Sequence, residues 1–479
     1  MGIGRNFIFS GILAVSNYVF PILVYPHVSR ALGVQNMGIC NFVDSIIDYF
    51  MLVSMLGIGA VGIREIASCN GDKNRLNGVF SSIMTVGSVT TLIALVALIV
   101  SANVVPALAE YRKLLMFGVI KLVGNFLMLD WLFRGLEDFK YVTYRTILIK
   151  MAYVVAVFIW IWHPQDYQLY YLFVCLMVGV NSVFSCLYAS KLVRFSVKSI
   201  SCRPYIKPIL IMGLYIFLTS MYTTFNVAYL GFSTDDVQVG YYTTSTKFFN
   251  ILIGLYMAFT MVMLPRMSAL LSEGKMDEFK HRMMQSFDIL FLIGVPLVVF
   301  MMCFATQFVE LFSGSEYLPA VPCTLLAFPL ILVIGIEQIL IIQVLIPLKK
   351  EKALLIGSAA GATAGLLLNI LLVRKLGALG SSIVWFGCEF VVLLVAQYFV
   401  ARYLQFRIPV KSLMENIIRY VPLAAILIVV SFYSPLNQMV NLAIGSVVSL
   451  AYFGVLQMYI LKNQAVLTFV NERILRLRK

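Results

Sequence analysis

Charged residues are scarce in this chain: they make up 12% of its 479 residues, whereas hydrophobic residues make up 61%. Apolar runs of about 20 residues, the length that crosses a bilayer, recur from end to end. This pattern excludes a sizeable soluble domain and predicts an all-α polytopic membrane protein. The first run is longer than a signal-peptide core and has no small-residue cleavage site, so we count it as a span.

The chain also lacks the residues of the common chemical sites. Its three histidines lie far apart, and none of its eight cysteines form a CxxC pair, which argues against a metal cluster or a disulfide framework. It has no GxxxxGK[ST] loop, so no nucleotide site is expected. The loops predicted outside have about 5–15 residues, a length that suits connectors better than a catalytic lid. We therefore expect no enzyme, no metal and no bound cofactor.

The apolar runs give fourteen candidate spans. Their approximate bounds are 7–26, 38–63, 79–101, 114–133, 143–162, 168–190, 208–230, 240–264, 286–311, 320–346, 353–373, 379–401, 419–434 and 440–461. Six spans precede a basic linker at 191–207, six follow it, and two remain. We expect an N-lobe at 1–200, a C-lobe at 201–410, and a segment at 411–479 with two extra helices and a basic cytoplasmic tail.

The net charge of +14 does not indicate a nucleic-acid surface, because the basic residues follow the topology. With the N-terminus inside, 28 of the 36 lysines and arginines fall in inside segments, five in outside segments and three within spans. Basic residues concentrate on the cytoplasmic side of membrane proteins. We therefore predict that both termini and the linker are cytoplasmic, and that no nucleic acid is a partner.

The two sets of six spans carry matching landmarks. The pairs that share an offset of 202 residues are Gly38 and Gly240, Arg64 and Arg266, and Lys73 and Lys275. An even number of spans per half gives a parallel repeat whose pseudo-two-fold axis lies along the membrane normal. A transporter of this plan has its site between the two lobes, near the midplane.

Two carboxylates, Asp44 and Asp48, lie four residues apart within the second span and share one helix face. A charge in the bilayer costs about 2.5–3.5 kcal/mol on insertion scales, so these side chains are expected to face protein or a wet cavity. Polar residues recur on spans one, two, seven and eight: Ser10, Asn17, Asn41, Asp44, Ser45, Asp48, Thr219, Tyr222, Thr223, Asn226, Thr243, Thr246, Lys247 and Asn250. We interpret them as the lining of one cavity. The alternative is ordinary hydrogen bonding between helices.

Further charges lie within spans. Lys121, Glu337 and Glu389 are deep in their spans, and each suits either a cavity wall or a buried structural pair. Lys247 is expected to oppose Asp44 and Asp48 across the cavity, because the three lie at similar depths from the outer ends of their helices. The alternative is that Lys247 pairs within its own lobe.

Two segments carry a family resemblance: YPHVSRALG at Tyr25–Gly33, followed by Gly38, and DWLFRGLEDFKY at Asp130–Tyr141. With the topology of residues 1 to about 405, they resemble the Wzx-type polysaccharide or O-antigen flippases of the multidrug/oligosaccharidyl-lipid/polysaccharide exporter superfamily. The resemblance implies a V-shaped fold that works by alternating access. It also implies transport of a polyprenyl-pyrophosphate-linked oligosaccharide across the bacterial cytoplasmic membrane, for O-antigen, capsule or exopolysaccharide synthesis.

The expected substrate-binding residues follow from this cargo, which has an apolar tail and a polar anionic head. Arg30 and Lys247 are candidates for phosphate contacts, and Asn41, Asn226, Asn250, Asp44 and Asp48 for sugar hydroxyls. Expected partners are the lipid-linked oligosaccharide and membrane lipids, with polysaccharide polymerase and chain-length proteins as further candidates.

Three alternatives stay open at this point. One is a multidrug exporter on the same fold, driven by an H⁺ or Na⁺ gradient through Asp44 or Asp48. Another is a lipid II flippase, since fourteen spans resemble that type more than the twelve of many Wzx proteins, and the extra pair helps form a lipid-tail groove there. The third is a membrane scaffold that recruits glycan enzymes.

Overall fold

The computed structural model describes residues 3–69, 71–221, 223–434 and 437–461. Within these ranges the regular structure is entirely helical. The helices are α1 (Ile3–Met55), α2 (Ile58–Ala67), α3 (Lys73–Val104), α4 (Arg112–Leu127), α5 (Asp130–Gly135), α6 (Phe139–Trp160), α7 (Tyr167–Leu192), α8 (Arg203–Ser220), α9 (Thr224–Ser233), α10 (Asp236–Ser272), α11 (Met276–Cys303), α12 (Ala305–Ser313), α13 (Val321–Ala327), α14 (Leu330–Gln338), α15 (Glu351–Leu368), α16 (Arg374–Leu404), α17 (Val410–Ile428) and α18 (Gln438–Val455). The predicted tail at 462–479 lies outside the described residues.

Ten helical segments of the described chain are long and apolar enough to cross a bilayer, so the chain is a multi-pass membrane protein. Two of them, Phe9–Ala67 and Glu351–Leu404, have 59 and 54 residues, more than twice the length that one span needs. Each is broken at a glycine with positive φ, Gly33 and Gly377. The bent pair α8–α9 and the 37-residue α10 are also long enough to cross. The helices are consistent with fourteen spans, and the exact count stays a prediction.

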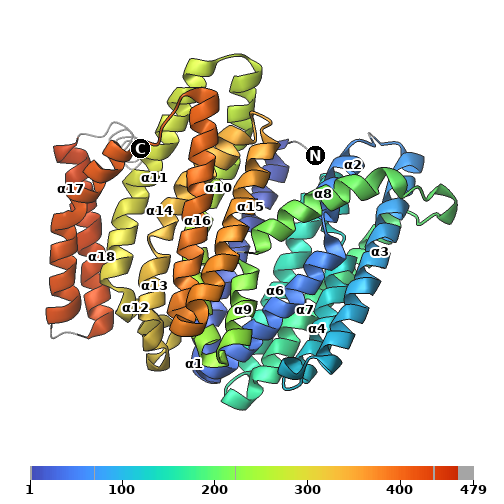
Figure 1. Ribbon diagram of the computed structural model, residues 1–479, viewed down its shortest axis with the longest axis horizontal. Coiled ribbons are helices and arrows are strands. Elements are labelled where there is room, and N and C mark those ends of the chain that lie inside the picture. Colours follow the sequence, from blue (N-terminus) through green and yellow to red (C-terminus); the bar gives the residue numbers. More distant parts are fainter. Residues whose placement is uncertain (1–2, 70, 222, 435–436, 462–479) are drawn as a thin grey trace, which may run out of the picture.

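The helices form two groups (Figure 1). α1 to α7 lie together on one side, α9 to α16 form the centre, and α17 and α18 stand at the far edge, away from α1 to α7. We call the first group the N-lobe and the helices α8 to α16 the C-lobe; the boundaries predicted at 200 and 410 stay predictions. Helix α8 packs against both α2 and α15, so it bridges the lobes.

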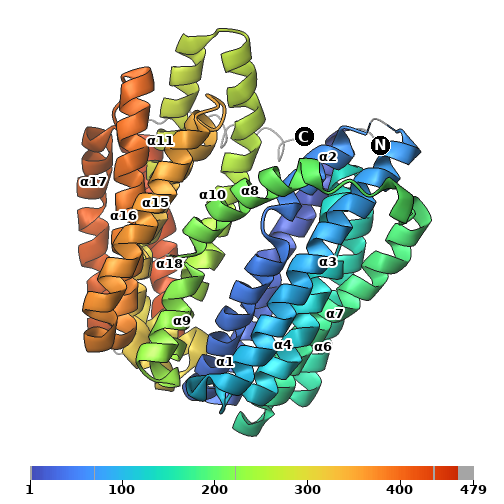
Figure 2. The same cartoon turned by 45° about the vertical axis from the view of Figure 1, so that its right-hand side comes forward.

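Apart from the bridging helix α8, the lobes meet at one end. In Figure 2 they approach each other at the end that carries the labels α1 and α9, and they diverge toward the end that carries α2 and the 191–207 linker. Gly33, where α1 is broken, lies at the first of these ends, because a Cβ atom there would contact Glu316 of the C-lobe. We call these the Gly33 end and the linker end. This V shape is the one that the resemblance implied.

Pairs of residues related by the 202-residue offset touch where α1 crosses α10. A Cβ atom added to Gly38 would lie 1.7 Å from the carbonyl oxygen of Asp236, and one added to Gly240 would lie 2.4 Å from the carbonyl oxygen of Val34. One turn further, the amide of Asn41 donates to the hydroxyl of Thr243, its equivalent in the repeat, over 3.0 Å. The pseudo-two-fold axis therefore passes between α1 and α10, and the paired glycines allow the two backbones to approach this closely.

Candidate functional site

A cavity of about 460 Å³ lies between the lobes, beside the crossing of α1 and α10. Helices α1, α6, α7 and α10 supply its walls. The lining residues are Asn17, Tyr18, Phe20, Pro21, Val24, Tyr25, Cys40, Asn41, Asp44, Lys150, Tyr153, Tyr170, Tyr171, Val174, Met177, Lys247, Asn250 and Ile251. Four of the seven predicted site residues, Asn41, Asp44, Lys247 and Asn250, are therefore brought together here.

One lysine from each lobe reaches this cavity, and each has the same kind of partners on α1. Lys247 of α10 donates to the side-chain oxygen of Asn41 over 3.1 Å, and its ammonium lies 4.7 Å from the ring centre of Tyr25. Lys150 of α6 donates to Asn17 over 2.6 Å, and its ammonium lies 5.7 Å from the ring centre of Phe20.

Neither lysine makes an ion pair with a carboxylate of the described residues. Their partners orient the two ammonium groups without neutralising them, because asparagine and aromatic rings carry no net charge. Two ammonium groups without a direct ion pair therefore face a cavity that Asp44 also lines, and together they can bind an anion.

The acids of the second span bind a different lysine from the one expected. The ammonium of Lys121 on α4 lies 2.6 Å from Asp44 and 2.9 Å from Asp48. Tyr171 of α7 also donates to Asp44, over 3.2 Å. Lys247 and Asp44 line the same cavity from different lobes, but the ion pair of the acids is with Lys121, because α4 packs directly on α1 and brings this lysine closer. A role of Lys247 opposite the acids stays a prediction.

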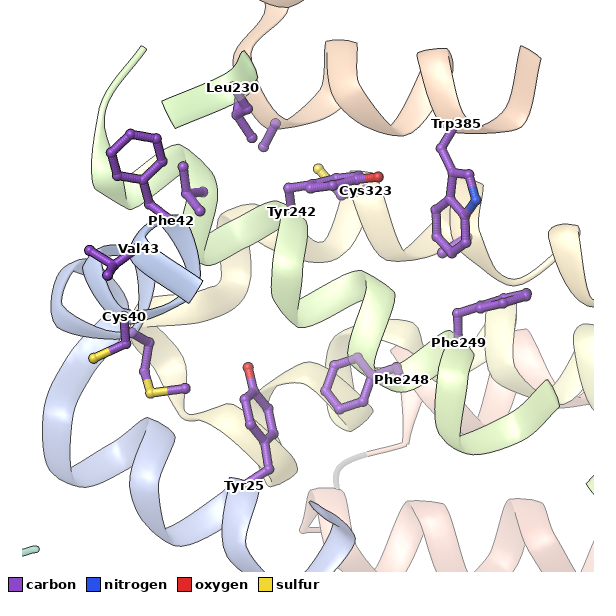
Figure 3. Packing of buried hydrophobic residues seen from close by; sticks show 14 of the residues in the cluster. Tyr25, Cys40, Phe42, Val43, Leu230, Tyr242, Phe248, Phe249, Cys323 and Trp385 are labelled. Atoms are coloured by element: carbon purple, nitrogen blue, oxygen red, sulfur yellow. The ribbon is translucent and has the colours of Figure 1, made fainter. Parts of the chain in front are cut away.

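The cavity is closed at the Gly33 end by contacts between the lobes. The Tyr25 and Thr244 hydroxyls are 2.7 Å apart, and the Ser29 hydroxyl donates to the Phe312 carbonyl over 3.1 Å. Figure 3 shows the apolar part of this closure, where Tyr25 and Phe42 of α1 lie near residues of α9 and α10. The hydrogen bonds lie within a continuous apolar core shared by both lobes, which excludes water from this end of the cavity.

Arg30 lies on the other side of this closure and does not reach the cavity. Its guanidinium donates to the backbone carbonyls of Glu310 and Leu311, in the last turn of α12. The carbonyls of a last helical turn can accept from a basic side chain, and that of Glu310 also accepts from the backbone N–H of Gly314 over 2.9 Å. Arg30 therefore links the lobes at the Gly33 end, outside the cavity lining, and its expected phosphate contact stays a prediction.

Asn226 is the second predicted residue that lies elsewhere. It is fully buried inside the C-lobe, where its amide donates to the hydroxyl of Tyr242 and to the carbonyl of Ser381 over 2.9 and 2.8 Å. The seventh span thus holds the lobe together at this point and does not line the cavity. Thr219 and Thr223 bond to carbonyls of their own span, and Tyr222 lies outside the described residues.

Asp48 stands one turn from Asp44 toward the linker end, with 39% of its side chain exposed. It is tied to the cavity through Lys121 and does not line the cavity itself. The predicted lining included the seventh span, whereas the observed lining includes α6 and α7 in its place. These two helices contribute Lys150, Tyr153, Tyr170 and Tyr171. Of these, only Lys150 had a signal in the sequence, as a charge seven residues inside the fifth predicted span.

Comparisons with known proteins agree with this architecture. The model of the family described as "Polysaccharide biosynthesis protein" matches residues 3–271, and the MatE model matches residues 208–371. A protein of Escherichia coli (strain K12) named "Putative O-antigen transporter" is 25% identical over 388 residues, which cover 79% of this chain and 91% of that protein. A protein of the same name from Shigella dysenteriae is 26% identical over 384 residues, 78% of this chain and 94% of that one.

Solved structures of transporters share the fold. The lipid II flippase MurJ, in an inward closed conformation, superposes with a TM-score of 0.76 at 12% identity, over 95% of this chain and 99% of that one. An inward-facing MATE-family multidrug transporter superposes with a TM-score of 0.62 at 16% identity, over 84% and 99%. The first family model covers more than half of the chain, including the whole N-lobe and the crossing of α1 with α10. This chain is therefore a member of the polysaccharide biosynthesis protein family.

Proposed function

We propose that this protein is a flippase that carries a polyprenyl-diphosphate-linked oligosaccharide from the inner to the outer leaflet of the bacterial cytoplasmic membrane. It serves the synthesis of O-antigen, capsule or exopolysaccharide, and works by alternating access. The observation that carries the proposal is the cavity between the lobes, where Lys150 and Lys247 present two ammonium groups that make no direct ion pair with a carboxylate of the described residues. The curated relatives, named as transporters, support the same reading.

The physical problem of this transport is the head group. A polyprenyl tail can stay in lipid throughout, whereas a diphosphate with sugars cannot cross hydrocarbon unaided. The cavity supplies two cations for the diphosphate, and Asn41, Asn250 and Asp44 offer hydrogen-bond partners for sugar hydroxyls. Closing the Gly33 end and opening the linker end, then reversing both, moves the head without exposing it to hydrocarbon.

The orientation is part of the proposal. We place the linker end in the cytoplasm, because basic residues gather in the segments predicted at that end. The conformation described here then faces inward, ready to take the head group from the inner leaflet. Reporter fusions after Lys207 are expected to give a cytoplasmic signal, and a periplasmic signal there would reverse the direction of transport.

Coupling to an H⁺ or Na⁺ gradient completes the proposal. Asp44 and Asp48 share one ammonium, that of Lys121, so this cluster of two carboxylates and one ammonium has one unbalanced negative charge. One bound proton or sodium ion balances that charge. Asp48→Asn is expected to remove the response of flipping to an imposed gradient. Polysaccharide polymerase and chain-length proteins stay candidate partners.

The experiment that tests the function is direct flipping of a fluorescent lipid-linked oligosaccharide in proteoliposomes. Lys247→Ala is expected to abolish flipping and Lys247→Arg to retain part of it, because the guanidinium keeps the charge with a different shape. Lys375→Ala, at an exposed position outside the cavity, is the matched control. Full flipping by Lys247→Ala would contradict the proposed head-group site.

The alternatives give other results in the same vesicles. Export of cationic dyes without flipping would indicate a drug exporter. Flipping of lipid II in preference to other carriers would indicate a lipid II flippase. A scaffold would move none of these substrates.

A further inference from the structure

The linker between the lobes, residues 191–207, carries positive charge only. It contains no aspartate or glutamate, and its five basic residues are Lys191, Arg194, Lys198, Arg203 and Lys207. All five are exposed, and none makes an ion pair within the described residues. The preference of basic residues for the cytoplasmic side explains this charge, but it does not explain the fixed conformation in which the structure holds the linker.

The middle of the linker is bound to the first turns of α3. Three of its backbone N–H groups donate to polar side chains of that helix. These bonds, of 2.8–2.9 Å, run from Arg194 to Asn77, from Ser196 to Ser81 and from Ser201 to Ser82. The segment between the first and the last of these bonds, residues 194–201, therefore has a defined position on α3, and we call it the strap.

The strap lies beside the helices, at the level of the membrane surface. Helix α3 begins at Lys73, and its bonds to the strap come from residues four to nine positions further along, about 6–14 Å below that end of the helix. Leu92 and Ile93 follow Ser81 and Ser82 by 11 residues, about three turns, so they share their face of α3. They are 61% and 57% exposed, as expected where a span meets lipid. Figure 1 shows the linker at the outer edge of the N-lobe, beside α3.

The strap exposes apolar and basic side chains together. Phe195 is 56% exposed and Val197 is 74% exposed, and the exposed Arg194 and Lys198 stand on either side of them in the sequence. Segments that lie in the membrane interface combine residues of these two kinds. Their apolar side chains enter the boundary between head groups and acyl chains, and their basic side chains are attracted to anionic lipids.

The neighbouring carboxylates have partners of their own. The segment 64–72, which precedes α3, contains two acids, Glu65 and Asp72. Glu65 binds Arg64 over 3.1 Å, and Asp72 accepts from the first backbone N–H groups of α3 as its N-terminal cap. The positive charge of the strap is therefore available to an anion outside the protein.

We propose that the strap is a binding site for anionic phospholipid in the leaflet at the linker end. Arg194 and Lys198 bind the phosphates, and Phe195 and Val197 enter the upper part of the acyl chains. This site is separate from the cavity and does not depend on the transported substrate, so the inference goes beyond the proposed function. Because the linker leads directly into α8, which packs on both lobes, a bound lipid ties the connection between the lobes to the membrane surface.

The test measures which lipid surrounds the strap. Val197→Cys, in a background that lacks the native cysteines, carries a bimane fluorophore, and the full chain is reconstituted in phosphatidylcholine vesicles. Quenching by brominated phosphatidylglycerol is compared with quenching by brominated phosphatidylcholine at the same mole fraction. We expect stronger quenching by the anionic lipid, and a smaller difference at high salt, because salt screens exposed charges.

Arg194→Gln combined with Lys198→Gln removes the charge of the strap. One basic residue near an anionic membrane surface contributes about a fivefold factor, so this variant is expected to weaken binding of the anionic lipid about 25-fold. Quenching by phosphatidylcholine is expected to stay as in the parent. An unchanged midpoint of thermal unfolding shows that the variant is folded, and Lys198→Gln alone, with a fivefold effect, replaces it otherwise.

Two controls separate the strap from the rest of the surface. Lys349→Gln combined with Lys352→Gln removes two exposed lysines of another loop predicted inside, and it is expected to leave quenching at the strap unchanged. A bimane at Leu92, on the lipid-facing part of α3, is expected to be quenched equally by both lipids.

Three results would overturn the site. The first is equal quenching of the Val197 reporter by the two lipids in the parent chain. The second is a preference for the anionic lipid that survives the loss of both charges. The third is quenching by neither lipid, which would show that the strap faces water, as a surface for a soluble partner would.

Discussion

Substitution of Gly38 by alanine tests whether the crossing of α1 with α10 closes the Gly33 end. The added Cβ atom would lie 1.7 Å from the backbone carbonyl oxygen of Asp236, where real contacts are at least 3.0 Å. A side chain could rotate away from such a contact, but a backbone atom cannot, so α10 must move away from α1. Overpacking costs about 1–3 kcal/mol, and this contact belongs at the upper end of that range.

A cost of about 3 kcal/mol corresponds to a shift of about 150-fold in the equilibrium between closed and open forms of the Gly33 end. The assay is disulfide crosslinking between cysteines placed at Asn41 and Thr243, whose side chains are 3.0 Å apart when this end is closed. It uses a background that lacks the native cysteines. We expect Gly38→Ala to abolish most of the crosslink and, in a separate preparation, to stop flipping.

Gly11→Ala is the matched control, since Gly11 lies on the same helix and a Cβ atom there would meet nothing within 4 Å. It is expected to crosslink and flip as the parent does. Parental crosslinking and flipping by Gly38→Ala would refute the argument that the paired glycines set the closure.

Two further predictions concern the interior of each lobe. Arg145→Ala removes a guanidinium that is 3% exposed and lies 2.7 Å from Asp130, and loss of one partner of a buried ion pair costs about 3–5 kcal/mol. Thermal unfolding in detergent should therefore show a lower midpoint temperature for this variant than for Arg194→Ala, the exposed control. Equal midpoints would show that the ion pair adds nothing to stability. A cysteine that replaces Asn250, which lines the cavity, should react with a small water-soluble thiol reagent, whereas a cysteine that replaces the fully buried Asn226 should not. Equal labelling of the two cysteines would contradict the assignment of Asn250 to the cavity lining.

Much of the fold could be predicted from the sequence. Apolar runs and the distribution of basic residues depend on how each segment partitions into a bilayer, which is a local property. The repeat was visible in the matched glycines, because the crossing of α1 and α10 requires small residues at equivalent positions. Gly38 and Gly240 were predicted as equivalent, and the structure places each within contact of the other's helix.

The site could be predicted only in part. Polar residues on spans one, two and eight indicated the cavity, since a charged or amide side chain within a bilayer needs a polar surrounding. The same reasoning wrongly added the seventh span, because Asn226 satisfies its amide inside the C-lobe. It also omitted α6 and α7, since tyrosines on a membrane helix give no pattern that separates a cavity wall from an ordinary packing face.

The sequence by itself therefore determined the membrane-spanning class, the two-lobed repeat and the helices on which most polar groups lie. Only the tertiary structure decided the partners of those groups: Lys121 for Asp44 and Asp48, Asn41 for Lys247, and the end of α12 for Arg30. The physical reason is that helix spacing fixes which residues share a face, whereas a span that is apolar on every side does not specify which neighbour that face will meet. That choice depends on the packing of all the helices together.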